Sequence, residues 1–381
     1  MKTNDSQVLV KGLLELDGNA RGHLRLPKSG YRADPNDVVV TREVFSKFGL
    51  RGGEMITGTT RPAKRRGKGR SAPELHEIAT IGGQSPDDYL DTPKFEDLTA
   101  IEPREALKFE TEGGPMTMRI IDLLTPIGLG QRGLIASPPR TGKTILLQQM
   151  ANGVATNHPH VHVIVLLIDE RPEEVTDMRR NIQGEVVASS NDRDIASHVR
   201  VARLVIEKAK RLLEAGEDVL ILLDSLTRLG RAFNAHTRGS GRIMSGGLDI
   251  GALTEPKSIF GAARNIENGG SLTIIASALI ETGSRMDEVI FNEFKGTGNM
   301  EIMLSREMAN RRLWPAIDIN LSGTRREELL LTPEALEVSH RTRRSLISRG
   351  PVRSMESLLE AMGKHANNAE FVRHLTGAAV R

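Results

Sequence analysis

A phosphate-binding loop is the first feature of the sequence that could do chemistry. The stretch QRGLIASPPRTGKT spans residues 131–144, and its last three residues, Gly142-Lys143-Thr144, follow an apolar run and open a predicted helix. Free amides at a helix N-terminus, an ammonium group and a hydroxyl are what a nucleoside triphosphate with Mg²⁺ requires. The usual pattern has a glycine where this chain has Ser137, followed by two prolines. A chance GKT after a strand therefore stays an alternative.

Acidic residues end two other apolar runs. VLILLDS places Asp224 at the end of an apolar run, and its carboxylate could hold Mg²⁺ together with the hydroxyl of Thr144. VIVLLIDERPEE carries Glu170, which could orient an attacking water beside the terminal phosphate. Each acidic residue alone could equally cap a helix. Three such features at successive strand ends favour a ligand site, because open α/β sheets bind ligands at that edge.

The elements that must position these residues alternate along the chain from about residue 119. Apolar, strand-like runs are separated by helical patterns, which favours a mostly parallel sheet covered by helices on both faces. The tail from Pro333 is also helical in pattern, with Arg341, Arg343 and Arg344 predicted to be exposed. The predicted strands are Gly133–Ala136, Val161–Asp169, Val219–Asp224, Leu272–Leu279 and Met300–Leu304, and the predicted helices are 143–156, 173–182, 193–216 and 255–267.

The first 83 residues have a different pattern, with five short strands between turn residues. Such a pattern predicts a small antiparallel barrel of the OB or cold-shock kind, which commonly binds single-stranded nucleic acid. We therefore predict a barrel domain over 1–83, a linker over 84–118 and an α/β domain over 119–381. The predicted strands are Lys11–Leu16, Arg21–Leu26, Asp37–Thr41, Glu54–Thr60 and Glu74–Ile81.

Composition limits the class of protein. The chain has 381 residues, no cysteine and no apolar run long enough to span a bilayer, and its N-terminus lacks the pattern of a secretion signal, so we expect a cytoplasmic protein with no membrane partner. Residues 1–83 hold 15 Lys+Arg against 9 Asp+Glu, whereas the remainder holds 37 against 40. This asymmetry favours a polyanion bound by the first domain, although basic loops that only maintain solubility are an alternative.

Longer segments carry a family resemblance. PIGLGQRGLIASPPRTGKT, LLIDERPEEVTDM, LLDSLTRLGRAFN, ETGSRMDEVIFNEFKGTGNMEI and PAIDINLSGTRREELLL resemble the bacterial Rho family of transcription termination factors, nearly continuously from about residue 119 to 331. The family's phosphate loop also carries two prolines and lacks the first glycine. The resemblance implies a RecA-like P-loop ATPase core behind an RNA-binding barrel. RecA-type recombinases and rotary ATP synthase subunits share that architecture but not the GTGNM, ETGSRMDE or SGTRREELL segments.

The resemblance implies ATP and Mg²⁺ as ligands and assigns residues to them. Glu170 would polarise the attacking water, with Arg171 beside it, and Thr144 and Asp224 would hold the metal. Trp314 would stack on the adenine, although a core tryptophan is an alternative. The nucleotide-binding set implied is Gly128, Leu129, Gly130, Gln131, Arg132, Gly133, Arg140, Thr141, Gly142, Lys143, Thr144, Ile145, Arg171 and Trp314.

Two further arginines imply a ring of subunits. Arg325, in SGTRREELL, matches the arginine finger that reaches into the neighbouring subunit's site, and Arg312 matches a second interface arginine. A finger supplied in trans makes hydrolysis depend on assembly. The resemblance therefore implies a homohexamer.

Two glycine-rich segments match the loops that grip RNA in the family's central pore. The first spans 235–251 and includes Arg242, Gly246 and Gly247, and the second spans 281–288 and includes Arg285. Arg242 and Arg285 stand where the family commonly has lysine, so a phosphate-pairing charge is kept. The alternative is two mobile surface loops, and Lys295 is a weaker candidate.

The barrel departs from the family pattern. Its RNA-contacting strand normally reads GFGFLR or GYGFLR, whereas this chain has Arg21, Gly22, His23, Leu24 and Arg25, without either aromatic residue. Tyr31 matches a tyrosine that contacts RNA in the family. Each lost stacking contact could cost about 1–3 kcal/mol per base. We therefore predict a primary RNA site that depends on charge, with Arg21 and the basic run 61–70 in place of stacking.

The combined prediction is an RNA-dependent ATPase and 5′-to-3′ RNA translocase that dislodges RNA polymerase, with elongation factors as possible partners. A second hypothesis is an RNA-coating ring with little motor activity, and a third is a recombinase-like DNA motor. The chain begins at the barrel, so we expect no helical bundle of the kind that many family members have before it.

Overall fold

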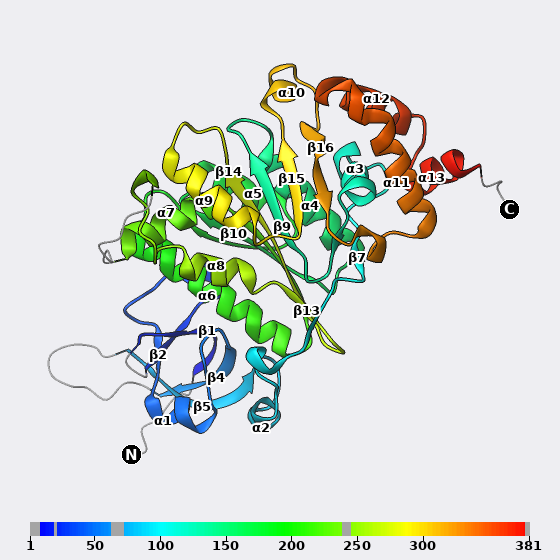
Figure 1. Ribbon diagram of the computed structural model, residues 1–381. Coiled ribbons are helices and arrows are strands. Elements are labelled where there is room, and N and C mark those ends of the chain that lie inside the picture. The colour runs from blue at the N-terminus through cyan, green and yellow to red at the C-terminus, as the bar shows by residue number, and fades with distance from the viewer. Residues whose placement is uncertain (1–7, 19–20, 62–71, 238–244, 378–381) are drawn as a thin grey trace, which may run out of the picture. The chain divides into compact units, whose positions relative to one another are not determined.

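The computed structural model describes residues 8–18, 21–61, 72–237 and 245–377. The chain divides into two compact units (Figure 1). The barrel unit comprises residues 1–99 and 200–217, and the sheet unit comprises residues 100–199 and 218–381. The barrel unit therefore extends beyond the predicted boundary at residue 83 and includes part of a helix from the middle of the chain.

Five short strands close the predicted barrel. Their order is β1-β2-β3-β5-β4, and the pairs are antiparallel except β3 with β5, which the sequence pattern did not predict. Alternate side chains such as Leu14, Leu24 and Ile56 are fully buried and fill the interior. The strands are β1 (Val8–Leu16), β2 (Gly22–Arg25), β3 (Val38–Val40), β4 (Met55–Arg61) and β5 (Glu74–Ile81), with the short helix α1 (Arg42–Lys47) after β3.

The C-terminal part of helix α6 (Ile195–Glu214) belongs to the barrel unit and packs on the barrel. Gly53 has φ +85°, and a Cβ there would lie 2.3 Å from the backbone of Glu207, so only glycine fits at this contact. Arg51 donates two hydrogen bonds to the carboxylate of Glu214, at 2.7 and 2.6 Å. Helix α2 (Pro86–Leu90) and a 3₁₀ turn at Phe95–Asp97 complete the unit.

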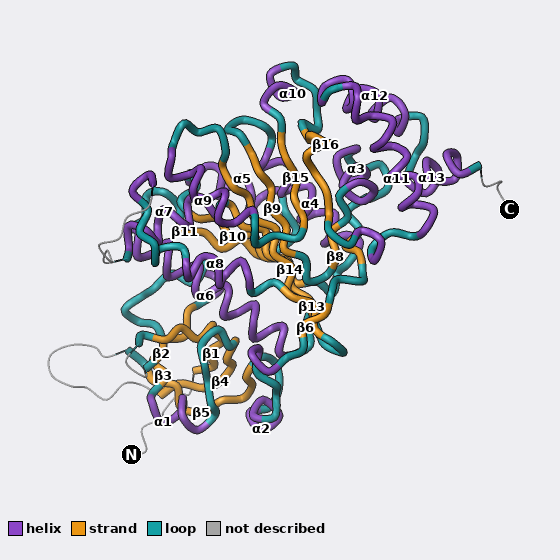
Figure 2. The backbone as a smooth tube through the Cα atoms, viewed as in Figure 1, coloured by secondary structure: helices purple, strands orange, loops and turns teal. Residues whose placement is uncertain are grey.

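A nine-stranded sheet forms the centre of the sheet unit in the described part of the chain. Its main order is β11-β10-β12-β14-β9-β15-β16, and all neighbours are parallel except β16, which pairs antiparallel with β15. Figure 2 shows strands of this sheet with helices around them. The predicted parallel α/β sheet is confirmed. The main strands are β9 (Arg132–Ser137), β10 (His162–Ile168), β11 (Glu185–Ser189), β12 (Asp218–Asp224), β14 (Ser271–Leu279), β15 (Met300–Leu304) and β16 (Ile317–Thr324).

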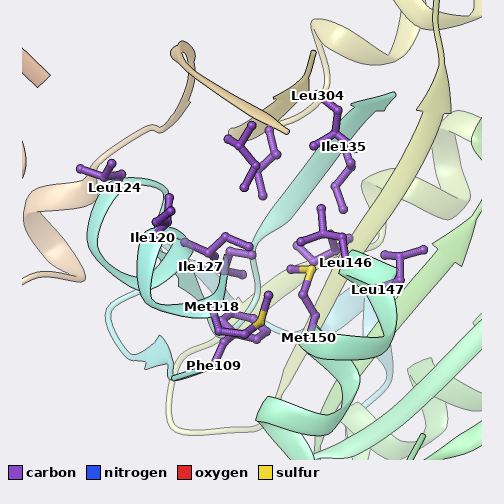
Figure 3. Close-up of a cluster of buried hydrophobic side chains, with 14 of the residues drawn as sticks. Phe109, Met118, Ile120, Leu124, Ile127, Ile135, Leu146, Leu147, Met150 and Leu304 are labelled. Atoms are coloured by element: carbon purple, nitrogen blue, oxygen red, sulfur yellow. The ribbon is translucent and has the colours of Figure 1, made fainter. Parts of the chain in front are cut away.

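An apolar cluster fixes the start of helix α4 (Lys143–Asn157) beside the end of β9. Figure 3 shows side chains of α4, of helix α3 (Met116–Leu124) and of β9 gathered in this cluster, among them Met150, Met118 and Ile135. All three are fully buried. Burying each such side chain stabilises the fold by about 1.5–3 kcal/mol, so the phosphate-binding loop joins two rigid elements.

Two of the predicted segments differ from the structure. The helix predicted over 255–267 ends at Gly261, and β13 (Arg264–Ile266) follows, pairing with β14 and with β6 (Ala100–Ile101). A two-stranded pair, β7 (Ala106–Leu107) with β8 (Ile127–Gly128), lies in the segment predicted as a linker and just beyond it. The other helices are α5 (Pro172–Asn181), α7 (Leu226–His236), α8 (Thr254–Gly261), α9 (Arg285–Lys295), α10 (Arg306–Asn310), α11 (Pro333–Leu346), α12 (Pro351–Gly363) and α13 (Asn368–Thr376).

The tail is helical as predicted, but one of its three arginines is not exposed. Arg343 is half-buried and donates hydrogen bonds to the backbone carbonyls of Ile319 and Leu124. Burial lowers the pKa of its guanidinium. Arg343 therefore ties α11 to the sheet unit. No helix of the described residues is long and apolar enough to cross a membrane.

Candidate functional site

The phosphate-binding loop runs from the end of β9 to the first turn of α4. Gly142 has φ +85°, and a Cβ at this position would lie 2.9 Å from the ring of Trp314. The hydroxyl of Thr141 donates to the carbonyl oxygen of Pro138 at 2.7 Å and lies 2.9 Å from the hydroxyl of Ser137. The serine that departs from the general consensus therefore braces the loop internally.

Lys143 lies between the two predicted acidic residues. Its Nζ is 2.5 Å from Oδ1 of Asp224 and 3.4 Å from Oε1 of Glu170. Both carboxyl groups are almost completely buried. Burial disfavours the charge of Lys143, but Asp224 and Glu170 outweigh it and raise the pKa of the ammonium group. The structure thus brings together the three residues that the sequence placed at separate strand ends.

Glu170 is poised to exchange a proton near neutral pH. Burial, and then the negative charge of Asp224, raise its pKa to about 7. A base with a pKa near the working pH is suited to accept a proton from water. Glu170 follows β10 and faces a cavity of about 820 Å³ that the phosphate-binding loop also lines. That volume lies in the range of ligand sites of nucleotide size.

Two residues of this site were missed by the sequence analysis. Arg228, in the first turn of α7, lines the cavity and forms an ion pair with Glu170 at 3.2 Å. Ser277 of β14 donates a hydrogen bond to Oδ1 of Asp224 at 2.8 Å. Arg228 stands four residues after Asp224, which puts it one helical turn beyond the strand end, and this spacing could have signalled it. Nothing in the local sequence singles out Ser277.

Oxygen ligands suitable for Mg²⁺ are present but do not form a complete cage. Thr144 lines the cavity, and the carboxylate of Asp224 contacts the ammonium group of Lys143, which lines the same cavity. Among the described residues no group of three or more acidic or histidine side chains could hold a metal ion. This donor set fits Mg²⁺, which keeps several waters and is usually bound by one or two protein oxygens together with substrate phosphates.

A smaller pocket adjoins the loop and contains Trp314. Its volume is about 180 Å³, and Ile145, Thr117 and Pro315 also line it. The side chain of Trp314 is 44% exposed, which disfavours its interpretation as a core tryptophan. An exposed aromatic face beside the phosphate-binding loop is suited to stack on a planar base.

The residues from Gly128 to Gly133 do not lie at the phosphate-binding loop of their own chain. They precede or begin β9, whereas the loop leaves its other end at Ser137. Ser137 lies four positions after Gly133 along the strand, a distance of roughly 13 Å. Arg325 also lies near the start of β9, away from the loop, because the preceding Thr324 pairs with Met300 and Met300 pairs with Gly133. Arg312, in contrast, follows α10 close to Trp314 in the sequence and is exposed.

The two glycine-rich segments meet at the start of α9. Gly246 has φ +78°, and a Cβ there would lie 2.6 Å from the backbone nitrogen of Met286. Arg285 is the first residue of α9 and is exposed. Asp287 anchors this end of the helix through two hydrogen bonds from Arg231, at 2.8 and 2.6 Å. Gly247 adjoins Gly246 in the same turn, and Arg242 lies outside the described residues.

Most of the predicted RNA-binding strand of the barrel has structural roles. Leu24 is fully buried, and a Cβ at Gly22 would lie 2.5 Å from Leu14. Arg25 is buried and pairs with Glu15 and with Asp37, the latter at 2.6 Å. Of the five predicted residues, Arg21 is exposed and His23 is half-buried. Most of the basic run 61–70 lies outside the described residues.

Tyr31 is part of the core of the barrel unit. Its side chain is 2% exposed, its hydroxyl accepts a hydrogen bond from Nζ of Lys208 at 3.1 Å, and that ammonium group lies 5.3 Å from the ring centre. Stacking on a base needs an exposed ring face. The burial of Tyr31 therefore argues against the RNA contact that the resemblance implied.

Comparison with known proteins identifies the family. Residues 117–324 match the nucleotide-binding domain of the ATP synthase alpha/beta family, and residues 10–87 match the RNA-binding domain of the Rho termination factor. Transcription termination factor Rho of Cereibacter sphaeroides is 51% identical over 363 residues, covering 94% of this chain and 85% of that protein. The chain belongs to the Rho termination factor family.

Other relatives of the Rho family are equally similar over most of this chain. Transcription termination factor Rho of Streptomyces lividans is 49% identical over 371 residues, and that of Aquifex aeolicus is 49% identical over 370 residues. These matches cover 97% and 96% of this chain. They cover 52% and 84% of the two relatives, so the chain spans about half the length of the first.

Solved structures agree on the fold. An ATPase from a type III secretion system matches with a TM-score of 0.61 at 22% identity, covering 83% of this chain and 94% of that chain. An ATP synthase subunit from Nanoarcheaum equitans matches with a TM-score of 0.58 at 17% identity, covering 74% and 79%. The predicted fold class, an ATPase core of this type with a small N-terminal barrel, is confirmed.

Proposed function

We propose that this chain is an RNA-dependent ATPase that moves along RNA in the 5′-to-3′ direction and terminates transcription by dislodging RNA polymerase. Its membership of the Rho family supports the assignment. The observation that carries the catalytic part is the convergence of Lys143, Glu170 and Asp224 on one phosphate-binding loop. The protein would act in the cytoplasm as a homohexamer.

Each residue of the phosphate site has a chemical task in this proposal. Lys143 turns from the two carboxylates to the β- and γ-phosphates when ATP enters the cavity. Glu170 then orients the attacking water and accepts its proton, since its pKa is about 7. Bound between Thr144 and Asp224, Mg²⁺ would neutralise charge that develops on the phosphates. Trp314 holds the adenine beside the loop.

Arg325 serves a neighbouring subunit's site. Within one chain, Arg325 and Lys143 lie at opposite ends of strand β9. Thr324 aligns with the start of β9, whereas the phosphate-binding loop follows the end of β9. Arg325 is exposed, and none of the described residues forms a hydrogen bond or ion pair with its guanidinium. These features support a finger that acts in trans.

RNA would be gripped where the two glycine-rich segments meet. Arg285 presents a positive charge from the first turn of α9, and Gly246 allows the neighbouring segment to approach that turn closely. A guanidinium can bind a phosphate with two hydrogen bonds. A single RNA strand passing these positions in each subunit would couple ATP cleavage to movement.

The test replaces the two residues on which hydrolysis depends. Glu170→Gln and Arg325→Ala should each reduce RNA-stimulated ATP turnover, the first by about 10²–10⁴-fold and the second by about 10³–10⁵-fold. Light scattering should show that both variants still assemble into hexamers. Arg326→Ala is the matched control, because this adjacent exposed arginine pairs with Glu328 at 2.6 Å. Normal turnover in either variant, or failure of the unmodified chain to assemble, would contradict the proposal.

A further inference from the structure

The exposed guanidinium of Arg325 must be placed through its backbone. No described side chain pairs with this group, and the side chain is exposed. An unrestrained arginine side chain loses rotamer entropy when it docks, so a fixed Cα reduces the range of positions that its guanidinium must search. The residue that holds the backbone of Arg325 therefore helps to position its guanidinium.

Asn299 holds the backbone of Arg325. Its carbonyl oxygen accepts a hydrogen bond from the backbone N–H of Arg325 at 2.9 Å. Its own N–H donates to the carbonyl oxygen of Arg132 at 2.9 Å. Its side-chain Oδ1 accepts two more hydrogen bonds, from Nε2 of Gln131 at 2.7 Å and from the N–H of Arg132 at 2.9 Å. Asn299 thus links the turn of Arg325 to the beginning of β9.

The other side of this link is rigid. Gln131 is 1% exposed, and a Cβ at the preceding Gly130 would lie 2.3 Å from the backbone of Asn265, so the chain is tightly packed there. The guanidinium of Arg132 donates to the carbonyl oxygens of Thr297 and Ala263, at 3.1 and 3.2 Å. Because Gln131 and Arg132 are held rigidly, the hydrogen bonds of Asn299 fix the backbone of Arg325 in one position.

We propose that Asn299 is a positioning residue for Arg325, and that Gln131 is the buried anchor through which it acts. This role rests on the proposed trans-acting finger. It also gives a task to Gln131, which was predicted to border the nucleotide and precedes β9, at the end of that strand away from the phosphate-binding loop. Asn299 and Gln131 would influence the ATP site of the neighbouring subunit without touching its substrate.

Two substitutions at Asn299 separate positioning from bulk structure. Asn299→Ala removes the acceptor Oδ1 and leaves Nε2 of Gln131 and the N–H of Arg132 without it. The finger should shift, and a displacement of about 1 Å can lower kcat by about 100-fold. Asn299→Asp keeps an oxygen at the same place and should restore most of the lost rate, because the side-chain Nδ2 of Asn299 makes no hydrogen bond to the described residues.

The measured quantities are kcat and KM for ATP hydrolysis in the presence of saturating RNA. Asn299→Ala should lower kcat by about 10–100-fold and leave KM within about twofold, since the finger acts on the transition state. Asn320→Ala is the matched control, because Asn320 is exposed on β16 and lies five residues before Arg325. An unchanged kcat in Asn299→Ala, or a changed KM alone, would overturn the proposal.

Mixed rings test whether the defect acts across subunits. Chains with Lys143→Ala keep an intact finger but lose the phosphate site, whereas chains with Asn299→Ala keep the phosphate site. Co-expression with two different affinity tags yields rings that contain both chains, and single-turnover cleavage of ATP is then measured. Mixed rings should cleave ATP at the composite interface within about threefold of the unmodified rate, although rings of either chain alone do not.

A parallel mixture keeps this inference separate from the proposed function. Rings that combine Arg325→Ala with Lys143→Ala must regain cleavage if the finger acts in trans at all. Failure of this mixture would refute the trans-acting finger. Recovery in this mixture together with failure of the Asn299→Ala mixture would refute only the role of Asn299, because its defect would then lie in its own phosphate site.

Discussion

The phosphate site and the RNA-binding strand of the barrel use their charged residues in opposite ways. In the phosphate site, Lys143 lies between two carboxylates and can exchange them for the phosphates of a ligand. In the barrel, Arg25 is enclosed by Glu15 and Asp37 and is almost completely buried. Both cations were predicted to bind a polyanion, but Arg25 forms structural ion pairs in the barrel unit, whereas Lys143 lines the cavity of the sheet unit.

The difference shows what a sequence match transfers reliably. A phosphate-binding loop is a local backbone motif, so its residues keep their task wherever the strand, loop and helix form. A nucleic-acid surface is made of exposed side chains, and exposure depends on which residues from distant segments cover it. Tyr31 illustrates this, because Lys208 of α6 covers a ring that the local sequence would leave free.

Of the variants that test this comparison, the one in the phosphate site is expected to have the largest effect. Lys143→Ala should reduce kcat/KM for ATP by about 10²–10³-fold, because the other cation of the loop, Arg140, is exposed and does not lie between Glu170 and Asp224. Phosphate release with RNA present measures this. Lys364→Ala is the control, since this exposed lysine directly follows α12 and, among the described residues, pairs only with Glu360 of that helix. An equal loss of kcat/KM in both variants would contradict a specific role of Lys143 in binding the phosphates.

Arg25→Ala should mainly destabilise the barrel unit. Removing one partner of a buried ion pair costs about 3–5 kcal/mol. Asp37 is left without its cation, whereas Glu15 keeps Arg200 at 3.0 Å. Both tyrosines, Tyr31 and Tyr89, belong to the barrel unit, and the single tryptophan belongs to the sheet unit. Tyrosine emission should therefore show an earlier urea transition, while tryptophan emission stays unchanged. A variant that lost RNA affinity with no change in the tyrosine transition would reverse our interpretation of Arg25.

The pH dependence of turnover sharpens the account of Glu170. Its pKa is raised to about 7, so the carboxyl group is protonated below that pH and cannot accept a proton from water. We expect kcat/KM for ATP to fall by about tenfold between pH 8 and pH 6. Stopped assays in buffers of constant ionic strength measure the profile. A flat profile over this range would exclude Glu170 as the base.

The smallest effect is expected at the barrel surface. Arg21 is the exposed cation of the RNA-binding strand, and its replacement by alanine should weaken binding to a cytidine-rich strand by a few-fold. The slope of log affinity against log salt should fall by about 0.7, the value for one contact with a single strand. Fluorescence anisotropy over a salt series gives both quantities. An affinity that does not change with salt would refute a charge-dependent primary site.

The sequence predicted the architecture and the phosphate site because both depend on local signals. The strand β9, the loop and α4 follow from one apolar run, two prolines and GKT, and Asp224 and Glu170 follow from strand-end positions. The contacts that need tertiary information could not be predicted. Ser277 reaches Asp224 from a strand 53 residues away, and Gln131 meets Asn299 across 168 residues. The helix predicted over 255–267 failed because pairing with β14 and β6 makes Arg264–Ile266 a strand.

ATP hydrolysis by the purified, assembled chain, measured with and without single-stranded RNA, tests the central claim most directly. We predict hexamers whose turnover rises strongly when RNA is added and disappears in Arg325→Ala. A chain that remains monomeric with RNA and Mg·ATP, or that hydrolyses ATP at the same rate when RNA is withheld, would contradict the account.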